Sequence, residues 1–344
     1  MARDGETPAP RVLAVVGPTA SGKSALADEL ATRLGSAVVS ADAMQVYRGM
    51  DIGTAKTPVS ERPVPLLCVD IADPTETFSV AEFQRHAHRD IDALVKKGRV
   101  PVVCGGTGLY VRAALEDMAF PAGEQDENPV RAHYQQLAAQ MGNEAFHALL
   151  AARDPQSAAL IHPNNVRRVV RAFELLEQGT SYAREHATLH VRTYRWPVRI
   201  FGLRVSRDLL YARINARVDA MLARGLLDEV SRLLATGYGT SATSVQAIGY
   251  KEILDALRAC GVTYDEAARR GITAIAAESA TLRAALDAAV EEVKLRSRRY
   301  AKRQMTWFRS NEGIVWLDAD DAGAADLADE VMRSLGDGGL MPRA

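Results

Sequence analysis

Residues 17–24 have the types and spacing of a phosphate-binding loop. They read G-P-T-A-S-G-K-S and match the pattern G-x-x-x-x-G-K-S. Backbone N–H groups of such a loop converge on phosphate oxygens, the lysine adds a cation, and the serine hydroxyl can bind magnesium. We therefore expect a polyphosphate site, with Ser24 as a Mg²⁺ ligand, at Gly17, Pro18, Thr19, Ala20, Ser21, Gly22, Lys23 and Ser24.

Asp42 is a second candidate, because it follows the predicted strand 37–40. A carboxylate at a strand end beside a phosphate loop can bind magnesium or act as a general base. The same residue type also caps helices, and that alternative stays open on position alone. Gln45 could reach the donor and acceptor atoms of a base, although a solvated helix residue is the simpler interpretation.

Thr107 lies in a glycine-rich turn, G-G-T-G at 105–108, after the predicted strand 100–104. Glycine allows backbone to approach a ligand closely, and the threonine hydroxyl can donate to phosphate; an ordinary tight turn is the alternative. Arg213 and Arg217 are four residues apart on a predicted helix and so share a face. They could grip phosphate, or they could form a solvated face.

Two basic clusters remain, at 162–171 and 296–309, and the second is interleaved with Tyr300, Trp307 and Phe308. Basic residues mixed with aromatic ones suit phosphate contact and base stacking. Each cluster alone could be a charged helix face, but two of them in a chain of formal net charge −1 favour RNA. The two clusters could therefore contact one RNA from two sides.

These residues need a scaffold, and the first third of the chain alternates between strand and helix patterns. Apolar runs at 12–16, 37–40, 66–71 and 100–104 predict strands, and a capping box at Ser79 predicts a helix between the last two. This order predicts an α/β fold of the P-loop NTPase type, with a parallel sheet flanked by helices. Ligands of such sheets collect at the carboxyl ends of the strands.

The 344 residues are 47% hydrophobic, which is enough for about two domains. We expect a disordered lead-in (1–10), a core (11–121 and 198–325), a helical insertion (122–197) and a helix end with a tail (326–344). The segment 180–196 is predicted to be irregular and the segment 314–317 to be a strand. The three scattered cysteines and the absence of a long apolar run predict a cytoplasmic protein.

Six segments in one order resemble the bacterial tRNA dimethylallyltransferases, also called tRNA isopentenyltransferases. The resemblance runs from about residue 13 to residue 308, and its second segment is long and highly specific. Besides the phosphate loop, the segments are 40–56 (SADAMQVYRGMDIGTAK), 105–110 (GGTGLY), 161–164 (IHPN), 248–251 (IGYK) and 299–308 (RYAKRQMTWF).

The resemblance implies transfer of the dimethylallyl group of dimethylallyl diphosphate to N6 of adenosine-37, directly 3′ of the anticodon. The tRNAs would be those that read codons beginning with U, and diphosphate would be released. Asp42 would be the general base, and Thr107 with one or both of Arg213 and Arg217 would steady the diphosphate, with Mg²⁺ as cofactor. The implied partners are this donor and the tRNA anticodon stem-loop, with no membrane, and we expect a monomer.

The resemblance also implies that the insertion 122–197 binds the tRNA anticodon stem-loop and that the two basic clusters are two sides of a tRNA clamp. Contact with tRNA is then expected at both clusters and at the family segments. The family usually has Ser after the aspartate, where this chain has Ala43. The expected contacts are Asp42, Ala43, Met44, Gln45, Thr107, Arg131, Arg167, Arg168, Val169, Val170, Arg171, Gln246, Gly249, Tyr250, Lys251, Arg299, Lys302 and Arg303.

Three alternatives stay in view. A small-molecule kinase would need a lid that holds ATP, and the basic insertion could imitate such a lid. The kinase interpretation, however, leaves residues 42–56 without a role. A prenyltransferase acting on free adenine nucleotides would not need the two basic clusters. An RNA-binding protein without catalysis leaves the phosphate loop and Asp42 unexplained.

Overall fold

The chain forms two compact units in a computed structural model. One comprises Met1–Met118 with Tyr194–Ala344, and the other is Ala119–Thr193, close to the predicted insertion 122–197. The predicted lead-in, apart from residue 10, and residues 337–344 of the predicted tail lie outside the described residues. The structure describes residues 10–118, 120, 129–188, 193–239 and 243–336.

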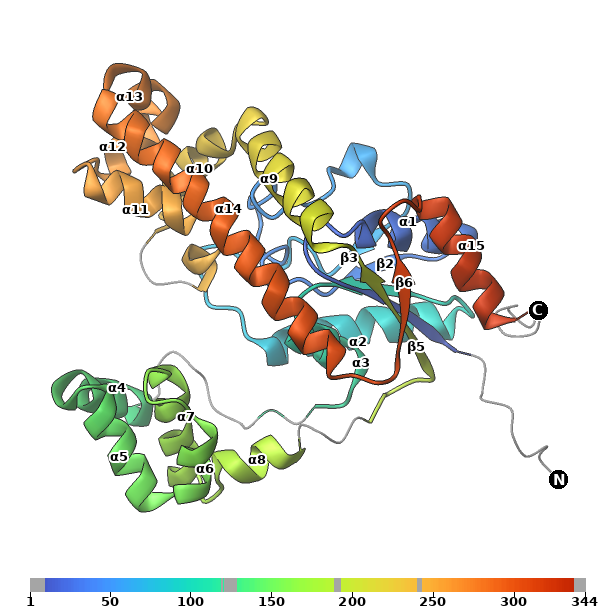
Figure 1. Ribbon diagram of the computed structural model, residues 1–344, viewed down its shortest axis with the longest axis horizontal. Coiled ribbons are helices and arrows are strands. Elements are labelled where there is room, and N and C mark those ends of the chain that lie inside the picture. Colours follow the sequence, from blue (N-terminus) through green and yellow to red (C-terminus); the bar gives the residue numbers. More distant parts are fainter. Residues whose placement is uncertain (1–9, 119, 121–128, 189–192, 240–242, 337–344) are drawn as a thin grey trace. The chain divides into compact units, whose positions relative to one another are not determined.

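A six-stranded parallel sheet is the centre of the larger unit (Figure 1), and it confirms the predicted α/β class. The strand order is β3-β2-β4-β1-β5-β6, so β1 lies between β4 and β5. The predicted final strand at 314–317 is confirmed as β6. The strands are β1 Val12–Val16, β2 Val38–Ser40, β3 Leu66–Leu67, β4 Val102–Gly105, β5 Val198–Arg204 and β6 Ile314–Asp318.

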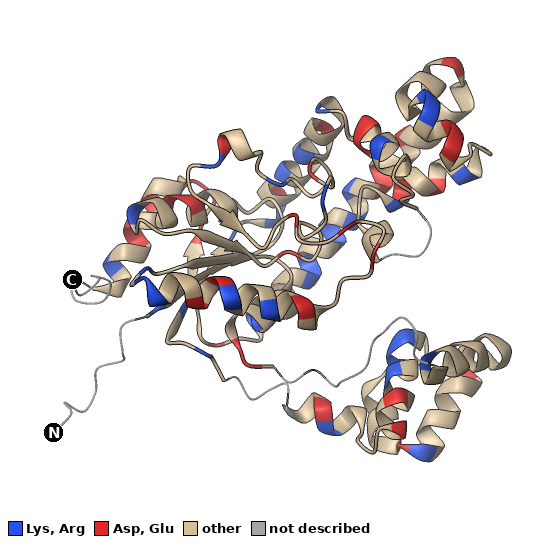
Figure 2. Ribbon diagram, turned by 180° about the vertical axis from the view of Figure 1, so that it is seen from behind, with Lys and Arg blue, Asp and Glu red and all other residues tan. Residues whose placement is uncertain are grey.

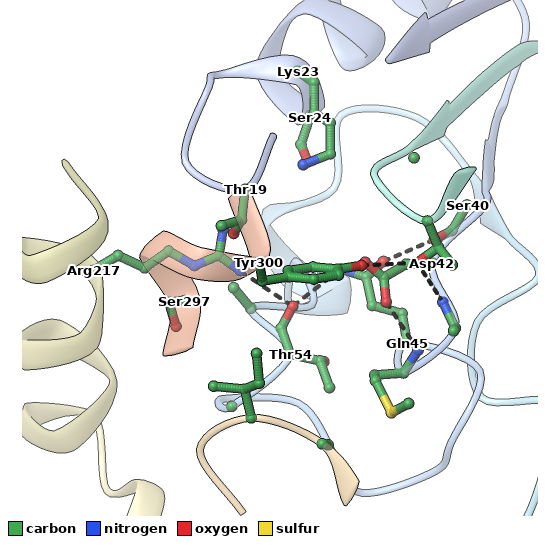
Figure 3. Close-up of a pocket in the computed structure, with 18 of the residues that line it drawn as sticks. Thr19, Lys23, Ser24, Ser40, Asp42, Gln45, Thr54, Arg217, Ser297 and Tyr300 are labelled. Atoms are coloured by element: carbon green, nitrogen blue, oxygen red, sulfur yellow. Dashed lines mark hydrogen bonds between the residues drawn. The ribbon is translucent and has the colours of Figure 1, made fainter. Parts of the chain in front are cut away.

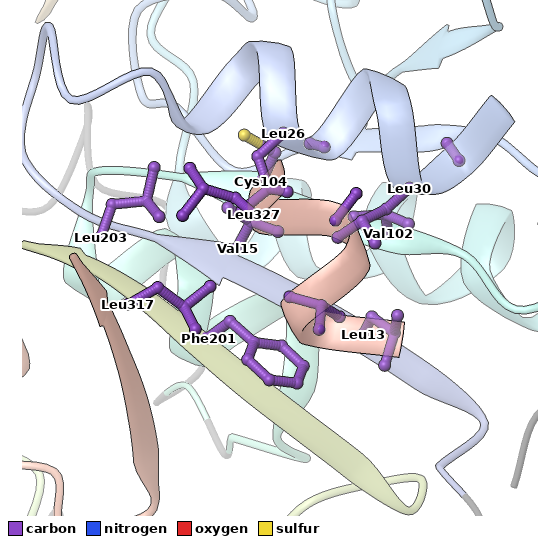
Figure 4. Packing of buried hydrophobic residues seen from close by; sticks show 14 of the residues in the cluster. Leu13, Val15, Leu26, Leu30, Val102, Cys104, Phe201, Leu203, Leu317 and Leu327 are labelled. Carbon is purple, nitrogen blue, oxygen red and sulfur yellow. The ribbon is translucent and has the colours of Figure 1, made fainter. Parts of the chain in front are cut away.

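Apolar side chains on one face of the sheet form the core beneath helices α1 (Lys23–Arg33) and α15 (Ala324–Leu335). Leu13 and Leu26 belong to this cluster, and both are fully buried (Figure 4). Burial on both faces explains why the central strands read as continuous apolar runs. The core therefore fixes the position of α1, whose N-terminus continues from the phosphate loop.

Other helices of the larger unit cover the sheet or extend from it. The capping box predicted at Ser79 is confirmed: its Oγ accepts the N–H of Glu82 at 3.2 Å, and the Glu82 carboxylate accepts the N–H of Ser79 at 2.8 Å. None of the described helices combines the length and apolar character that a membrane crossing requires. The remaining elements are η1 Val59–Glu61, α2 Val80–Lys96, α3 Gly108–Leu115, α9 Arg207–Ala223, α10 Leu226–Leu234, η2 Thr243–Gln246, α11 Lys251–Ala259, α12 Tyr264–Arg270, α13 Ile272–Glu278 and α14 Ala280–Arg309.

The smaller unit is helical, as predicted, and has its own core around Phe146 and Phe173, both fully buried. Acidic and basic residues are interspersed over both units (Figure 2). The helices of the smaller unit are α4 Pro129–Met141, α5 Asn143–Arg153, α6 Pro155–Leu160, α7 Val166–Glu177 and α8 Tyr182–Thr188.

Two local predictions are wrong. The strand predicted at 66–71 has only the two residues Leu66–Leu67, because Cys68 (φ 59°) and Asp70 (φ 58°) adopt left-handed backbone conformations that end the extended run. The segment predicted to be irregular, 180–196, contains helix α8.

Candidate active site

A cavity of about 450 Å³ lies at the carboxyl ends of β1, β2 and β4, where the predicted motifs follow their strands (Figure 3). It is lined by cationic, acidic and hydroxyl side chains that are far apart in the sequence. Binding cavities commonly have volumes of a few hundred Å³ and up, so this one is large enough for a small ligand. Its polar lining includes Lys23, Ser24, Asp42, Thr107 and Arg217.

The phosphate loop turns from β1 into α1 through left-handed backbone at Ala20 (φ 62°) and Gly22 (φ 90°). Such turns direct successive N–H groups toward one point, which creates an anion site at a helix N-terminus. The Lys23 ammonium donates to the carbonyl of Pro18 at 3.2 Å, and burial lowers the pKa of Lys23. Ser24 is exposed toward the cavity. Lys23 and Ser24 line the same cavity, so the loop presents a cation and a hydroxyl to one space.

Asp42 follows β2 in a turn and not at the start of a helix, so the helix-cap alternative is wrong. One carboxylate oxygen accepts the N–H of Met44 at 2.9 Å, and the half-buried side chain lines the cavity. The N–H of Ala43, the residue directly after Asp42, is donated to Oγ1 of Thr107 at 3.3 Å. The loop of Asp42 is therefore tied to the glycine-rich turn after β4.

Gly105 and Gln45 explain how closely these loops approach. A Cβ at Gly105 would collide with the carbonyl of Ala41, so only glycine fits there. The Gln45 amide accepts from the Ser40 hydroxyl at 2.8 Å and donates to the carbonyl of Thr54 at 3.3 Å. Both ends of the Gln45 amide thus have partners within the protein, and this side chain is not a solvated helix residue.

The two arginines of α9 point to different places, although their spacing puts them on one helix face. Arg217 lines the cavity and donates to the carbonyl of Thr54 at 3.5 Å, and burial lowers its pKa. Arg213 instead donates to the carbonyls of Ala319 (3.2 Å) and Asp320 (3.0 Å) beyond β6. Arg217 therefore lines the cavity, whereas Arg213 holds the backbone that follows β6.

In the smaller unit, the predicted tRNA contacts divide by orientation. Arg167 and Arg168 are exposed on α7. Val169 and Val170 are buried in the core of the unit, so their side chains offer no surface to tRNA, contrary to prediction. Arg131 and Arg171 form ion pairs with the buried carboxylate of Glu174, at 2.6 Å and 3.0 Å.

The predicted tRNA contacts at residues 246–251 also differ in exposure. Gln246 is exposed and lines the cavity, whereas Gly249 and Tyr250 are buried, so the Tyr250 ring offers no surface to tRNA. Lys251 forms an ion pair with Asp255 at 2.7 Å.

Three basic candidates lie on α14. Arg299, Lys302 and Arg303 are all exposed. The Arg303 guanidinium also lies over the ring of Tyr300, 5.6 Å from its centre, and Arg303 lines the cavity. These positions leave their charged ends accessible to phosphate.

Sequence reasoning missed several residues that hold the cavity loops. The Tyr300 hydroxyl lies 3.3 Å from Oγ1 of Thr107, and the buried Gln304 contacts two glycine-rich loops. Buried Glu229 accepts the N–H groups of residues 51–53 at 2.7–3.2 Å, and the Lys56 ammonium is buried between Asp51 and Asp70. Tyr300, Gln304 and Phe308 are four residues apart and so share one face of α14. Two polar side chains on the same face as a large apolar one were the available sequence signal.

Residues 45–311 match the family model described as IPP transferase, and residues 10–62 match the model described as isopentenyl transferase. The chain belongs to the IPP transferase family. The tRNA dimethylallyltransferase of Geobacillus kaustophilus is 43% identical over 327 residues, which cover 94% of this chain and 96% of that protein. That of Bacillus velezensis is 43% identical over 309 residues (89% and 90%). These matches confirm the predicted resemblance.

Solved structures agree with this assignment. The tRNA isopentenylpyrophosphate transferase of Bacillus halodurans matches with a TM-score of 0.63 and 38% identity, covering 96% of this chain and 97% of that one. A eukaryotic dimethylallyltransferase acting on tRNA matches with a TM-score of 0.73 and 25% identity, covering 93% of this chain and 77% of that one. The family therefore shares this fold over nearly the whole chain.

Proposed function

We propose that this enzyme transfers the dimethylallyl group from dimethylallyl diphosphate to N6 of adenosine-37 in tRNAs that read codons beginning with U. The observation that carries the proposal is the shared cavity of Asp42, Lys23 and Arg217. It offers a carboxylate for an amine proton and two cations for a diphosphate. The names of the relatives, tRNA dimethylallyltransferases, support the same reaction.

The reaction needs charge neutralisation on one side and a base on the other. The N6 nitrogen forms a bond to the allylic carbon while the bond from that carbon to the diphosphate oxygen breaks, and its electron pair leaves with diphosphate. The phosphate loop, Lys23 and Arg217 stabilise the leaving group, because fixed cations and N–H groups act on charge as it develops. Asp42 accepts the proton that N6 loses. Thr107 holds the loop of Asp42 through the N–H of Ala43.

Magnesium fits the residues present. Among the described residues there is no cluster of three or more His, Cys, Asp or Glu side chains that could hold a metal by itself. Mg²⁺ usually keeps waters and binds through substrate phosphates with one or two protein oxygens. Ser24 would supply the protein oxygen, and the bound ion would neutralise charge on the diphosphate.

A tRNA partner is supported by the exposed cations on both units. Arg167 and Arg168 on α7, and Arg299, Lys302 and Arg303 on α14, are exposed. Such side chains supply the phosphate contacts that dominate nucleic-acid affinity. An adenine must leave its stack to reach a cavity, so a stem-loop with an unpaired adenosine is the suitable substrate.

The proposal is tested with an anticodon stem-loop and labelled dimethylallyl diphosphate. We expect magnesium-dependent labelling of the stem-loop, with a mass increase of one dimethylallyl group at the adenosine 3′ of the anticodon. A matched stem-loop with inosine at that position lacks the N6 amine and should remain unlabelled. Binding of ATP in preference to the prenyl donor would favour a kinase, and equal labelling of free AMP would favour a free-nucleotide prenyltransferase.

A further inference from the structure

The side chain of Gln304 bridges two glycine-rich loops of the cavity. Its Oε1 accepts the N–H of Thr19 in the phosphate loop at 2.9 Å, and its Nε2 donates to the carbonyl of Gly106 at 2.9 Å. The residue comes from α14, and only 5% of it is exposed. One amide group therefore joins the loop after β1 to the turn after β4.

Both loop groups depend on this amide. Thr19 precedes α1, so its N–H has no place in the hydrogen-bond pattern of that helix. A Cβ at Gly106 would collide with Nε2 of Gln304, so the glycine is what lets the amide reach the backbone. The hydrogen bond to the Gly106 carbonyl is buried and the one from the Thr19 N–H is partly buried. Backbone groups shielded from water that lose their partners destabilise the arrangement that contains them.

We propose that Gln304 is a positioning residue for the diphosphate, which it does not itself contact. Anchoring the Thr19 N–H fixes the start of the phosphate loop, and the later N–H groups of that loop then face the cavity in one arrangement. Anchoring Gly106 places Thr107, one residue further along, at the same cavity. The inference rests on the proposed function for the identity of the donor.

The chemistry of the side chain makes the role specific. The bridge needs one acceptor and one donor together at the end of one flexible side chain, and a glutamine amide supplies both. Methionine has a similar length but neither strong group. Ionised glutamate keeps the acceptor for Thr19, but it faces the carbonyl of Gly106 with a second acceptor. Protonated glutamate regains a donor and should bridge the two loops as glutamine does.

The test measures binding of inorganic diphosphate and of dimethylallyl diphosphate by calorimetry for the wild type, Gln304→Met and Gln304→Glu. We expect Kd for both ligands, and KM for the donor, to rise about 10- to 100-fold in Gln304→Met, the scale set by the loss of one or two hydrogen bonds shielded from water. The affinity of Gln304→Met for the stem-loop should stay within about twofold of the wild-type value. The matched control is Gln84→Met, which removes a hydrogen bond from Gln84 to the carbonyl of Met118 and should leave Kd unchanged.

Gln304→Glu gives a second readout that general destabilisation would not produce. The ratio of its diphosphate Kd to that of the wild type should fall as pH is lowered from about 8 to about 5.5, because the buried carboxyl takes up a proton. An unchanged Kd in Gln304→Met, or a ratio independent of pH in Gln304→Glu, would overturn the inference. So would a loss of stem-loop affinity with donor binding intact, since Gln304 would then serve RNA. A wild type that binds diphosphate without prenylating tRNA would contradict the proposed function alone.

Discussion

The hydroxyl of Tyr300 lies 3.3 Å from Oγ1 of Thr107, and this contact links α14 to the glycine-rich turn after β4. Oγ1 of Thr107 also accepts the N–H of Ala43, the neighbour of Asp42. Burial raises the pKa of Tyr300 to about 12, so the hydroxyl keeps its proton at neutral pH. A chain of hydrogen bonds thus runs from α14 to the loop of the proposed base.

Tyr300→Phe should lower kcat about two- to tenfold, because it removes one hydrogen bond that orients Thr107. The Kd of dimethylallyl diphosphate should change little. Steady-state kinetics on a stem-loop measure kcat, and calorimetry measures the donor Kd. Tyr264→Phe on α12 is the matched control and should behave as the wild type does. A loss of donor affinity without a loss of rate would show that Tyr300 serves the donor.

Asp42→Asn should lower the rate of prenyl transfer about 10²- to 10⁴-fold, the usual effect of removing a general base. Donor affinity should be nearly unchanged, because the amide retains an acceptor for the N–H of Met44. Asp28→Asn is the control, since Asp28 also lines the cavity and has no role in the proposed step. Equal losses of rate and donor affinity would instead identify Asp42 as a magnesium or diphosphate ligand.

Lys23→Ala should weaken donor binding and leave stem-loop affinity nearly intact, because it removes a cation from the phosphate loop. Burial lowers the pKa of Lys23 in the free enzyme, so the charged form is lost at a lower pH than for an ordinary lysine. Donor affinity should therefore fall as pH rises through that lowered pKa, and the fall should be absent in Lys23→Ala. Calorimetric titrations across pH measure it. A collapse of tRNA binding with donor binding unchanged would contradict the assignment of the loop.

Arg217 and Arg213 form a matched pair, because they lie four residues apart on α9 and only Arg217 lines the cavity. Arg217→Ala should raise the donor Kd about 10- to 100-fold, as expected for a charge-assisted contact to phosphate. Arg213→Ala should lower the free energy of unfolding by about 1–2 kcal/mol, because it removes two hydrogen bonds to carbonyls, with little change in donor Kd. The reverse pattern would show that Arg213 moves to the donor on binding.

Alanine variants of the basic clusters should weaken tRNA binding and flatten its salt dependence. Removing one cation that binds a phosphate should reduce the slope of log K against log salt by about 0.7–0.9. We expect the full effect for Arg167 and Arg168, and for Arg299 with Lys302 and Arg303, because all five are exposed.

Arg171→Ala should reduce the slope less, because Glu174 already pairs with that guanidinium. Arg269→Ala is the control for a basic residue of the larger unit, since Arg269 forms an ion pair with Asp265 at 2.8 Å. Salt titrations of stem-loop affinity measure every variant. Unchanged slopes in both cluster variants would identify these residues as solvated surface charge.

The sheet and the phosphate loop could be predicted because their signals are local. An apolar run such as Val12–Val16 indicates a buried strand, and the loop pattern is contiguous. The strand predicted at 66–71 was wrong because the left-handed conformation of Asp70 has no such local signal; there the carboxylate pairs with Lys56 at 2.6 Å. Local sequence therefore determined where elements exist better than where they end.

The contacts of the site were harder to predict, since they join residues far apart in the chain. Val169 and Val170 were assigned to tRNA as part of a continuous segment, but the helical period turns them into the core. Arg213 and Arg217 share a face, yet each finds a different partner. Gln304 meets Thr19 across 285 residues, a distance at which no spacing rule applies.

The 285-residue separation of Thr19 and Gln304 also determines when the proposed donor site becomes complete during synthesis. A ribosome adds about 5–20 residues per second, so Gln304 follows Thr19 by about 15–60 s. The phosphate loop of a nascent chain lacks its anchor throughout that interval, although β1 and α1 have already emerged. A chain that terminates before α14 keeps the phosphate-loop motif but lacks the bridge to Gly106. Under the proposed function, such truncated products should bind the prenyl donor more weakly than the full chain does.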